Sequence, residues 1–179
     1  GLRENPDVIV IGEMRDTETM QVAVTAALTG HLVIATVHTS NAIQAIERII
    51  TLFPADLRGS IATDLSLALL GVVAQRLLPS AKTSGMIPAV EVLLTSSTVR
   101  KLIADRNYEM LDDLMRQASV PGMQTFCRDL FRLYQSGAVA LEDARFAADN
   151  ADEFDLLVRG LETGADTFRK RYGDKTGSD

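Results

Sequence analysis

The period of the hydrophobic positions changes along the chain and divides it into two regions. Up to about residue 94, short β-branched and aliphatic runs alternate with amphipathic stretches of helical period, which predicts strands alternating with helices. The expected strands are 8–11, 31–38, 72–79 and 86–94, and the expected helices are 17–29, 40–54 and 57–69. Beyond Thr95 the pattern is helical, at 98–104, 108–117, 126–134, 141–148 and 153–161. The sequence therefore predicts an α/β core followed by a small all-helical subdomain.

Polar residues and glycines mark where several of these helices begin and end. Asp16 is expected to cap the helix 17–29, and Gly30 to end it. Ser40 is the expected cap of the next helix, and Ser96 or Ser97 of the helix 98–104. These signals place the helix starts directly after the strands.

The strands 72–79 and 86–94 are joined by a short polar and glycine-containing connection, which predicts a hairpin at the edge of the sheet. Glu91 lies inside the second strand, where a structural role is expected rather than a catalytic one. The aromatic and leucine stripe from Phe126 to Tyr134 is expected to be core, and Cys127 to be a small buried hydrophobe.

Composition narrows the class of protein. The chain has 179 residues, 46% of them hydrophobic and 23% charged, with a net charge of −6 and a pI near 4.9. This balance is typical of one globular domain or slightly more, and it argues against nucleic acid as a partner. No apolar run reaches membrane-spanning length and no signal segment opens the chain, so a cytoplasmic location is expected. A single cysteine excludes an internal disulfide and a multi-cysteine metal site.

Ionisable residues follow the first two predicted strands. Gly12, Glu13 and Arg15 come directly after the run 8–11, and His38 ends the second strand, with His31 at its opposite end. Ligands of open α/β sheets bind outside the carboxyl ends of the strands, which would place these residues at the rim of a site. The alternatives are an ordinary buried strand with a polar exit and histidines with structural hydrogen bonds.

Two motifs carry a resemblance to a known family. Residues 2–16 read LRENPDVIVIGEMRD, which resembles the Walker B signature of the secretion and pilus ATPases, L-R-x-x-P-D, aliphatics, G-E-aliphatic-R-D. Residues 30–39 resemble the His box of the same family. Later segments resemble the PilT/PilU-type pilus retraction ATPases, at 89–94, 122–126 and 142–144. Three others look closer to PilU, at 64–67, 75–79 and 150–152. The resemblance covers about residues 1–160.

This resemblance implies a partial RecA-like P-loop NTPase core over residues 1–94, and it extends through the helical subdomain expected over 95–163. The segment 164–179 lies outside the resemblance, and its glycines and mixed charges predict a solvated, disordered tail. It also implies ATP and Mg²⁺ as cofactors. Glu13 would be the Walker B glutamate beside the metal ion and the attacking water, with Gly12 and His31 near the nucleotide. His38 would sense the terminal phosphate.

Three arginines are candidates for reaching a phosphate or a neighbouring subunit, namely Arg15, Arg48 and Arg76. The alternative for each is a surface or intramolecular ion pair. The first is the only one that directly follows the catalytic strand.

The chain contains no Gly-Lys dipeptide, so the Walker A loop expected in this family is missing. We therefore expect the carboxyl-terminal half of a hexameric motor subunit for type IV pilus retraction and twitching motility, inactive by itself. The implied partners are identical subunits, related pilus motor subunits and an inner-membrane platform protein, which would hold the protein at the membrane periphery. Two alternatives remain. One is an assembly or type II secretion ATPase, many of which carry a four-cysteine zinc site. The other is a P-loop-free regulatory or docking subunit.

Overall fold

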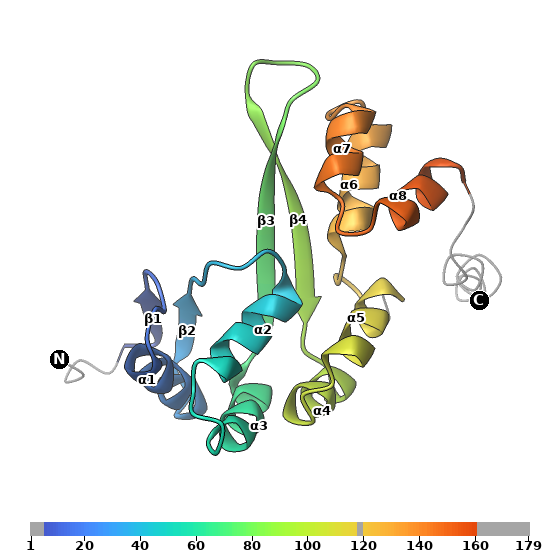
Figure 1. Cartoon of the computed structure of the whole chain (residues 1–179). Coiled ribbons are helices and arrows are strands. Elements are labelled where there is room, and N and C mark those ends of the chain that lie inside the picture. The colour runs from blue at the N-terminus through green and yellow to red at the C-terminus, as the bar shows by residue number, and fades with distance from the viewer. Residues whose placement is uncertain (1–5, 118–119, 161–179) are drawn as a thin grey trace, which may run out of the picture. The chain divides into compact units, whose positions relative to one another are not determined.

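A computed structural model describes residues 6–117 and 120–160, and two compact units are recognised in it (Figure 1). Among the described residues, the first unit contains 6–74 and 93–114, and the second contains 75–92, 115–117 and 120–160. These limits differ from the domain boundary expected at residue 94, which stays a prediction. The expected tail 164–179 and the first four residues of the Walker B-like string lie outside the described residues.

The elements follow the order that the hydrophobic pattern predicts. In the first unit they are β1 (Val8–Ile11), α1 (Thr17–Leu28), β2 (Leu32–Ala35), α2 (Ala42–Thr51), α3 (Arg58–Ala68), α4 (Ser97–Ala104) and most of α5 (Tyr108–Arg116). The hairpin strands β3 (Gly71–Pro79) and β4 (Met86–Leu94) belong to both units. The second unit adds α6 (Phe126–Gln135), α7 (Leu141–Ala147) and α8 (Ala151–Val158).

Helix α1 begins at the expected residue and ends at Leu28, one residue before the expected end. The Asp16 carboxylate accepts a hydrogen bond from the Thr19 amide at 2.8 Å, so it satisfies one of the free N–H groups of the first turn. Gly30, just after the helix, has a φ of +100°, which glycine adopts without the strain that a side chain would bring. The predicted cap and stop are therefore confirmed.

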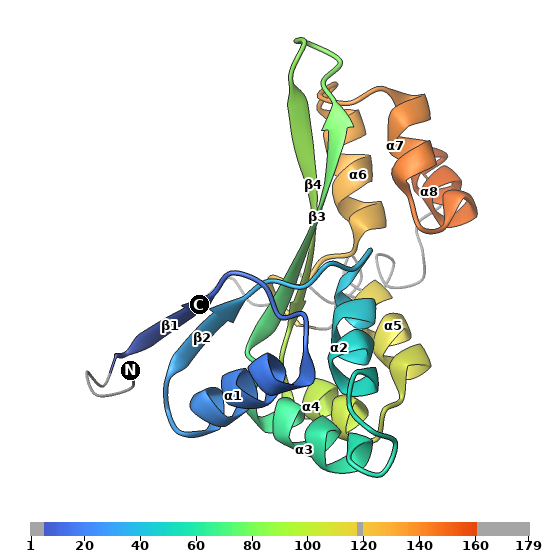
Figure 2. The ribbon, with the colours of Figure 1, turned by 60° about the vertical axis from the view of Figure 1, so that its left-hand side comes forward.

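Strands β1 and β2 pair in parallel, side by side (Figure 2). Their side chains alternate between a half-buried and an exposed face, because successive residues of a strand point to opposite sides. The exposed face carries two cross-strand pairs, Val8 with Leu32 and Val10 with Ile34. Within the described residues these four apolar side chains remain open to solvent.

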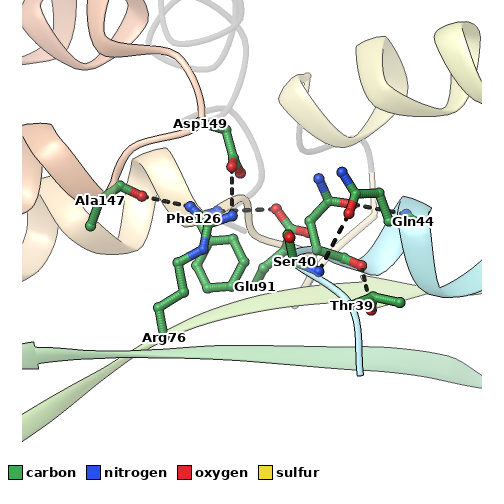
Figure 3. Close-up of polar contacts among 9 residues, drawn as sticks. Thr39, Ser40, Gln44, Arg76, Glu91, Phe126, Ala147 and Asp149 are labelled. Carbon is green, nitrogen blue, oxygen red and sulfur yellow. Dashed lines mark hydrogen bonds and ion pairs between the residues drawn. The ribbon is translucent and has the colours of Figure 1, made fainter. Parts of the chain in front are cut away.

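The cap of α2 differs from the prediction by one residue. Asn41, not Ser40, is the N-cap, and its side-chain oxygen accepts from the Gln44 amide at 2.8 Å. The Gln44 side chain in turn accepts from the Ser40 amide at 3.4 Å, as Figure 3 shows. Serine and asparagine side chains can both cap a helix, but Asn41 directly precedes the first helical residue. The prediction of Ser40 as the cap was therefore wrong.

Helices α3 and α4 pack against each other in the first unit. Arg100 of α4 donates hydrogen bonds from Nη1 to the carbonyls of Ser66 and Leu67, each at 2.6 Å. A cation at this place satisfies carbonyls that the end of α3 leaves free and matches the negative end of the α3 dipole.

Gly71, the first residue of β3, lies very close to β4. A β-carbon there would lie 2.8 Å from the Leu93 carbonyl oxygen, so the close approach of the two hairpin strands requires glycine.

In the second unit, α6 supplies the core that its stripe predicts. Phe126, Leu130 and Leu133 are buried, together with Phe154 of α8. Cys127 is also buried, and burial raises the pKa of its thiol to about 12, as expected for an unreactive core cysteine. No helix within residues 6–117 and 120–160 is long and apolar enough to cross a lipid bilayer.

Candidate functional site

Hydrogen bonds join the segments that follow β1 and β2. The Met14 amide donates to the Thr36 carbonyl at 2.9 Å, and the Thr36 hydroxyl donates to the Gly12 carbonyl. Because the two strands are parallel, their carboxyl ends lie at the same edge of the pair. The residues between and just after these contacts therefore lie close together, although they are more than twenty positions apart in the chain.

Glu13 lies at the centre of this edge. One carboxylate oxygen, Oε2, is 2.5 Å from Nη2 of Arg15, and the other, Oε1, is 3.2 Å from Nε2 of His38. The glutamate side chain is 24% exposed, whereas those of the arginine and histidine are 77% and 80% exposed. The structure thus brings together three of the residues that the sequence indicated, with the two basic groups facing solvent.

The basic neighbours favour the ionised form of the carboxylate. The hydrogen bond from Arg15, followed by the charges of Arg15 and His38, lowers the pKa of Glu13 below its ordinary value against the opposing effect of desolvation. The same ion pair raises the pKa of Arg15. Glu13 is therefore an ionised acceptor at neutral pH, able to receive a hydrogen bond from water or to ligate a cation.

His31 lies at the amino end of β2, opposite to His38. Its Nδ1 is 3.0 Å from the Ala26 carbonyl and 3.3 Å from the Thr29 hydroxyl, so the ring closes the turn between α1 and β2. Within the described residues it makes no contact with Glu13. These bonds support the structural alternative for this histidine.

The two remaining candidate arginines lie in different units. Arg48 lies on the exposed face of α2. Arg76 is directed instead to the Phe126 ring, the Ala147 carbonyl and the Asp149 carboxylate of its own unit, as Figure 3 shows. These contacts correspond to the intramolecular alternative for Arg76.

Sequence reasoning missed the contact from Thr36 to Gly12 and the surroundings of Arg76. The first lay within a recognised motif, but the motif alone does not say which carbonyl the hydroxyl reaches. The second joins residues 50 or more positions apart, and no local pattern reports such a pairing.

The side chains that could ligate a metal ion limit which metal the site can bind. Among the described residues, no group of three or more histidine, cysteine, aspartate or glutamate side chains could hold a metal by itself. Mg²⁺ commonly takes only one or two carboxylates and completes its shell with water and phosphate oxygens. A single ionised glutamate at a strand end fits that mode of binding, whereas it does not fit a zinc or calcium cage.

Comparisons with known proteins identify the family of the chain. Residues 1–106 match the family model described as "Type II/IV secretion system protein". The type IV pilus ATPase PilU of Pseudomonas aeruginosa is 46% identical over 166 residues, which are 92% of this chain and 44% of PilU. The type IV pilus assembly ATPase PilB of Thermus thermophilus is 53% identical, but over 76 residues, which are 42% of this chain and 8% of PilB.

Among solved structures, that of the pilus retraction motor PilT with bound ADP superposes with a TM-score of 0.77. The two share 41% identity over 85% of this chain and 42% of that one. This match confirms the predicted α/β fold with a partial RecA-like core. The chain spans less than half the length of these relatives.

Proposed function

Because the chain belongs to the Type II/IV secretion system protein family, we propose that it is the carboxyl-terminal part of a hexameric ATPase that powers type IV pilus retraction. The observation that carries this proposal is the match to PilU along almost the whole chain. The match to the assembly ATPase PilB is of higher identity but covers only 76 residues. Retraction therefore has the broader support, and assembly is the second candidate.

In this proposal Glu13 orients the water that attacks the terminal phosphate of ATP. Its ionised carboxylate accepts a hydrogen bond from that water and is held at a fixed strand end, which is the positioning that phosphoryl transfer requires. Arg15 keeps the carboxylate ionised through the 2.5 Å contact. Mg²⁺, when bound, would neutralise phosphate charge, and Glu13 is the residue that would hold it.

His38 and Gly12 complete the proposed site. The imidazole is exposed, and its Nε2 lies 3.2 Å from Oε1 of Glu13. In the proposal this N–H turns from the carboxylate to a phosphate oxygen when the nucleotide is bound. A β-carbon at Gly12 would meet nothing within 4 Å, so packing within the described residues does not demand glycine there. Close approach of the backbone to a phosphate would explain it. His31 supports the site indirectly, through the α1–β2 turn.

The assembly of the complete protein follows from the same proposal. Six subunits form a ring at the cytoplasmic side of the inner membrane, contact a platform protein of the pilus, and work with related motor subunits. Arg15 and Arg48 are the exposed arginines that can reach a neighbour's phosphates, a common device in ring-shaped NTPases.

The complete protein is expected to hydrolyse ATP, whereas the 179-residue chain alone is expected to show no turnover above background, because no Gly-Lys dipeptide supplies a Walker A cradle. The measurement is steady-state phosphate release by both proteins at equal subunit concentration. Turnover by the chain alone, or a complete coding sequence without a Walker A loop, would contradict the proposal. The second result would support a regulatory or docking subunit.

Deletion of the complete gene separates the two motor functions. Loss of twitching with pili retained on the cell surface supports a retraction motor. Loss of the pili themselves would identify an assembly motor.

His38→Ala in the complete protein is expected to lower kcat more than His31→Ala does, because only His38 contacts the Glu13 carboxylate. We expect about tenfold for the first, in the lower range for a group that orients a reacting partner. Circular dichroism and thermal unfolding serve as controls for both variants. The reverse order of kcat in folded proteins would assign His38 a structural role.

A further inference from the structure

A second group of polar contacts, away from Glu13, surrounds Arg76 in the second unit. Nη1 of its guanidinium donates to the Ala147 carbonyl at 2.5 Å, and Nη2 lies 2.5 Å from Oδ1 of Asp149. The guanidinium carbon is 4.1 Å from the centre of the Phe126 ring. Only 21% of the arginine side chain is exposed, whereas 45% of the Asp149 side chain is, so the guanidinium is largely covered and the carboxylate lies at the surface.

Each partner comes from a different part of the helical region. Phe126 begins α6, Ala147 ends α7, and Asp149 lies in the link to α8. Arg76 itself belongs to β3, 71 and 73 positions away from the last two. A guanidinium suits this task because its planar face stacks on an aromatic ring while its edge donates in fixed directions. One side chain thus holds three helical segments to one strand.

The neighbouring strand holds α6 by a separate set of bonds. The Val90 amide donates to Asp129 of α6 at 2.8 Å, and the Val90 carbonyl accepts from the Gln124 side chain at 2.8 Å. The backbones of Val92 and Gln124 exchange both hydrogen bonds, at 2.9 and 3.0 Å. These contacts pair the backbone groups of Val90 and Val92 on β4, and they reach α6 and the residues just before it.

We propose that Arg76 is a conformational lock that fixes the α7–α8 link to the hairpin, so that β3, β4 and α6–α8 move as one rigid body. The β4 contacts anchor α6, and the hairpin connection reaches the α6–α7 link, through the Ala81 amide to the Ala138 carbonyl and Lys82 Nζ to the Ser136 carbonyl, each at 2.9 Å. Arg76 extends the anchorage to the end of α7 and to Asp149. The proposal concerns the chain itself and does not depend on the motor function. It assigns the Arg76 guanidinium to its own subunit and not to a neighbour's phosphate.

Hydrogen exchange of the 179-residue chain, followed by mass spectrometry of peptides, tests this lock. Arg76→Gln is expected to raise the exchange of amides in 141–158 about tenfold or more, while the amides of α2 exchange as in the parent chain. Arg76→Lys keeps the charge but lacks the planar fork, so it is expected to restore at most part of the protection. Arg159→Gln is the matched control, because it removes an exposed arginine of the same unit.

Asp149→Asn provides a milder variant in which Arg76 keeps its ring and carbonyl contacts. It is expected to raise exchange in 147–158 less than Arg76→Gln does. The lock is overturned if Arg76→Gln leaves exchange in 141–158 unchanged, or if Arg76→Lys restores full protection. Should Arg76→Gln unfold the whole chain, Asp149→Asn decides, since unchanged exchange in that variant also overturns the proposal.

Discussion

Glu13→Gln in the complete protein is expected to lower ATP turnover by about a hundredfold or more while leaving nucleotide affinity nearly unchanged. The amide is nearly isosteric with the carboxylate but carries no negative charge. It therefore orients water poorly and loses the ion pair with Arg15 that the structure shows at 2.5 Å. Single-turnover hydrolysis and binding of a fluorescent nucleotide measure the two quantities separately.

Glu18→Gln is the matched control, because Glu18 is an exposed carboxylate in the first turn of α1, only five positions later. It should leave turnover as in the parent protein. An equal loss of binding and turnover in Glu13→Gln would mean that the carboxylate maintains the site and does not take part in hydrolysis.

The same variant can show whether an arginine serves a neighbouring subunit. Rings that mix Glu13→Gln subunits with Arg15→Ala subunits contain some interfaces where both groups are intact, if the arginine acts across the interface. Activity above that of either parent ring supports such a role. If rings shown to be mixed recover no ATPase activity, Arg15 acts on Glu13 of its own subunit. The same experiment with Arg48→Ala subunits tests Arg48.

Asp129→Ala is expected to destabilise the chain by about 2–4 kcal/mol, the range for losing a charged hydrogen bond and leaving a buried amide without its acceptor. The aspartate is 2% exposed and accepts from the Val90 amide and from the Arg132 side chain. Denaturant unfolding followed by circular dichroism gives the free energy of unfolding for each variant.

Asp113→Ala is the control, because that aspartate is exposed on α5. Its free energy of unfolding should stay within about 0.5 kcal/mol of the parent value, as for ordinary surface positions. Similar unfolding free energies for the two variants would show that the bond to β4 contributes little to stability.

The order of strands and helices and much of the Glu13 site follow from local patterns. Strand 8–11, the Asp16 cap and the hairpin were predictable because period, capping chemistry and turn residues act over a few positions. The predicted place of the hairpin at the edge of the sheet was wrong, because β3 and β4 form a two-stranded sheet of their own. The proximity of Glu13 and His38 was also accessible, since both follow parallel strands and such ends share an edge.

Other features depend on where distant segments meet. Asp129 sits on an amphipathic helix and looks like an ordinary surface charge, yet folding buries it against the Val90 amide 39 positions away. Arg76 was a reasonable candidate for a phosphate contact until the positions of Phe126 and Asp149 were known. The choice between Ser40 and Asn41 as cap rests on a one-residue difference in backbone geometry, which composition does not resolve.

The exposed face of the β1–β2 pair has a consequence for handling the chain in solution. Val10 is 72% exposed and Ile34 52%, in a short pair of parallel strands whose residues are all apolar. Such a surface promotes adhesion between molecules, and a strand edge offers free amides for the next copy. If light scattering of this chain detects larger particles, we therefore expect association through that apolar face. Such association differs from the assembly of subunits into a motor ring.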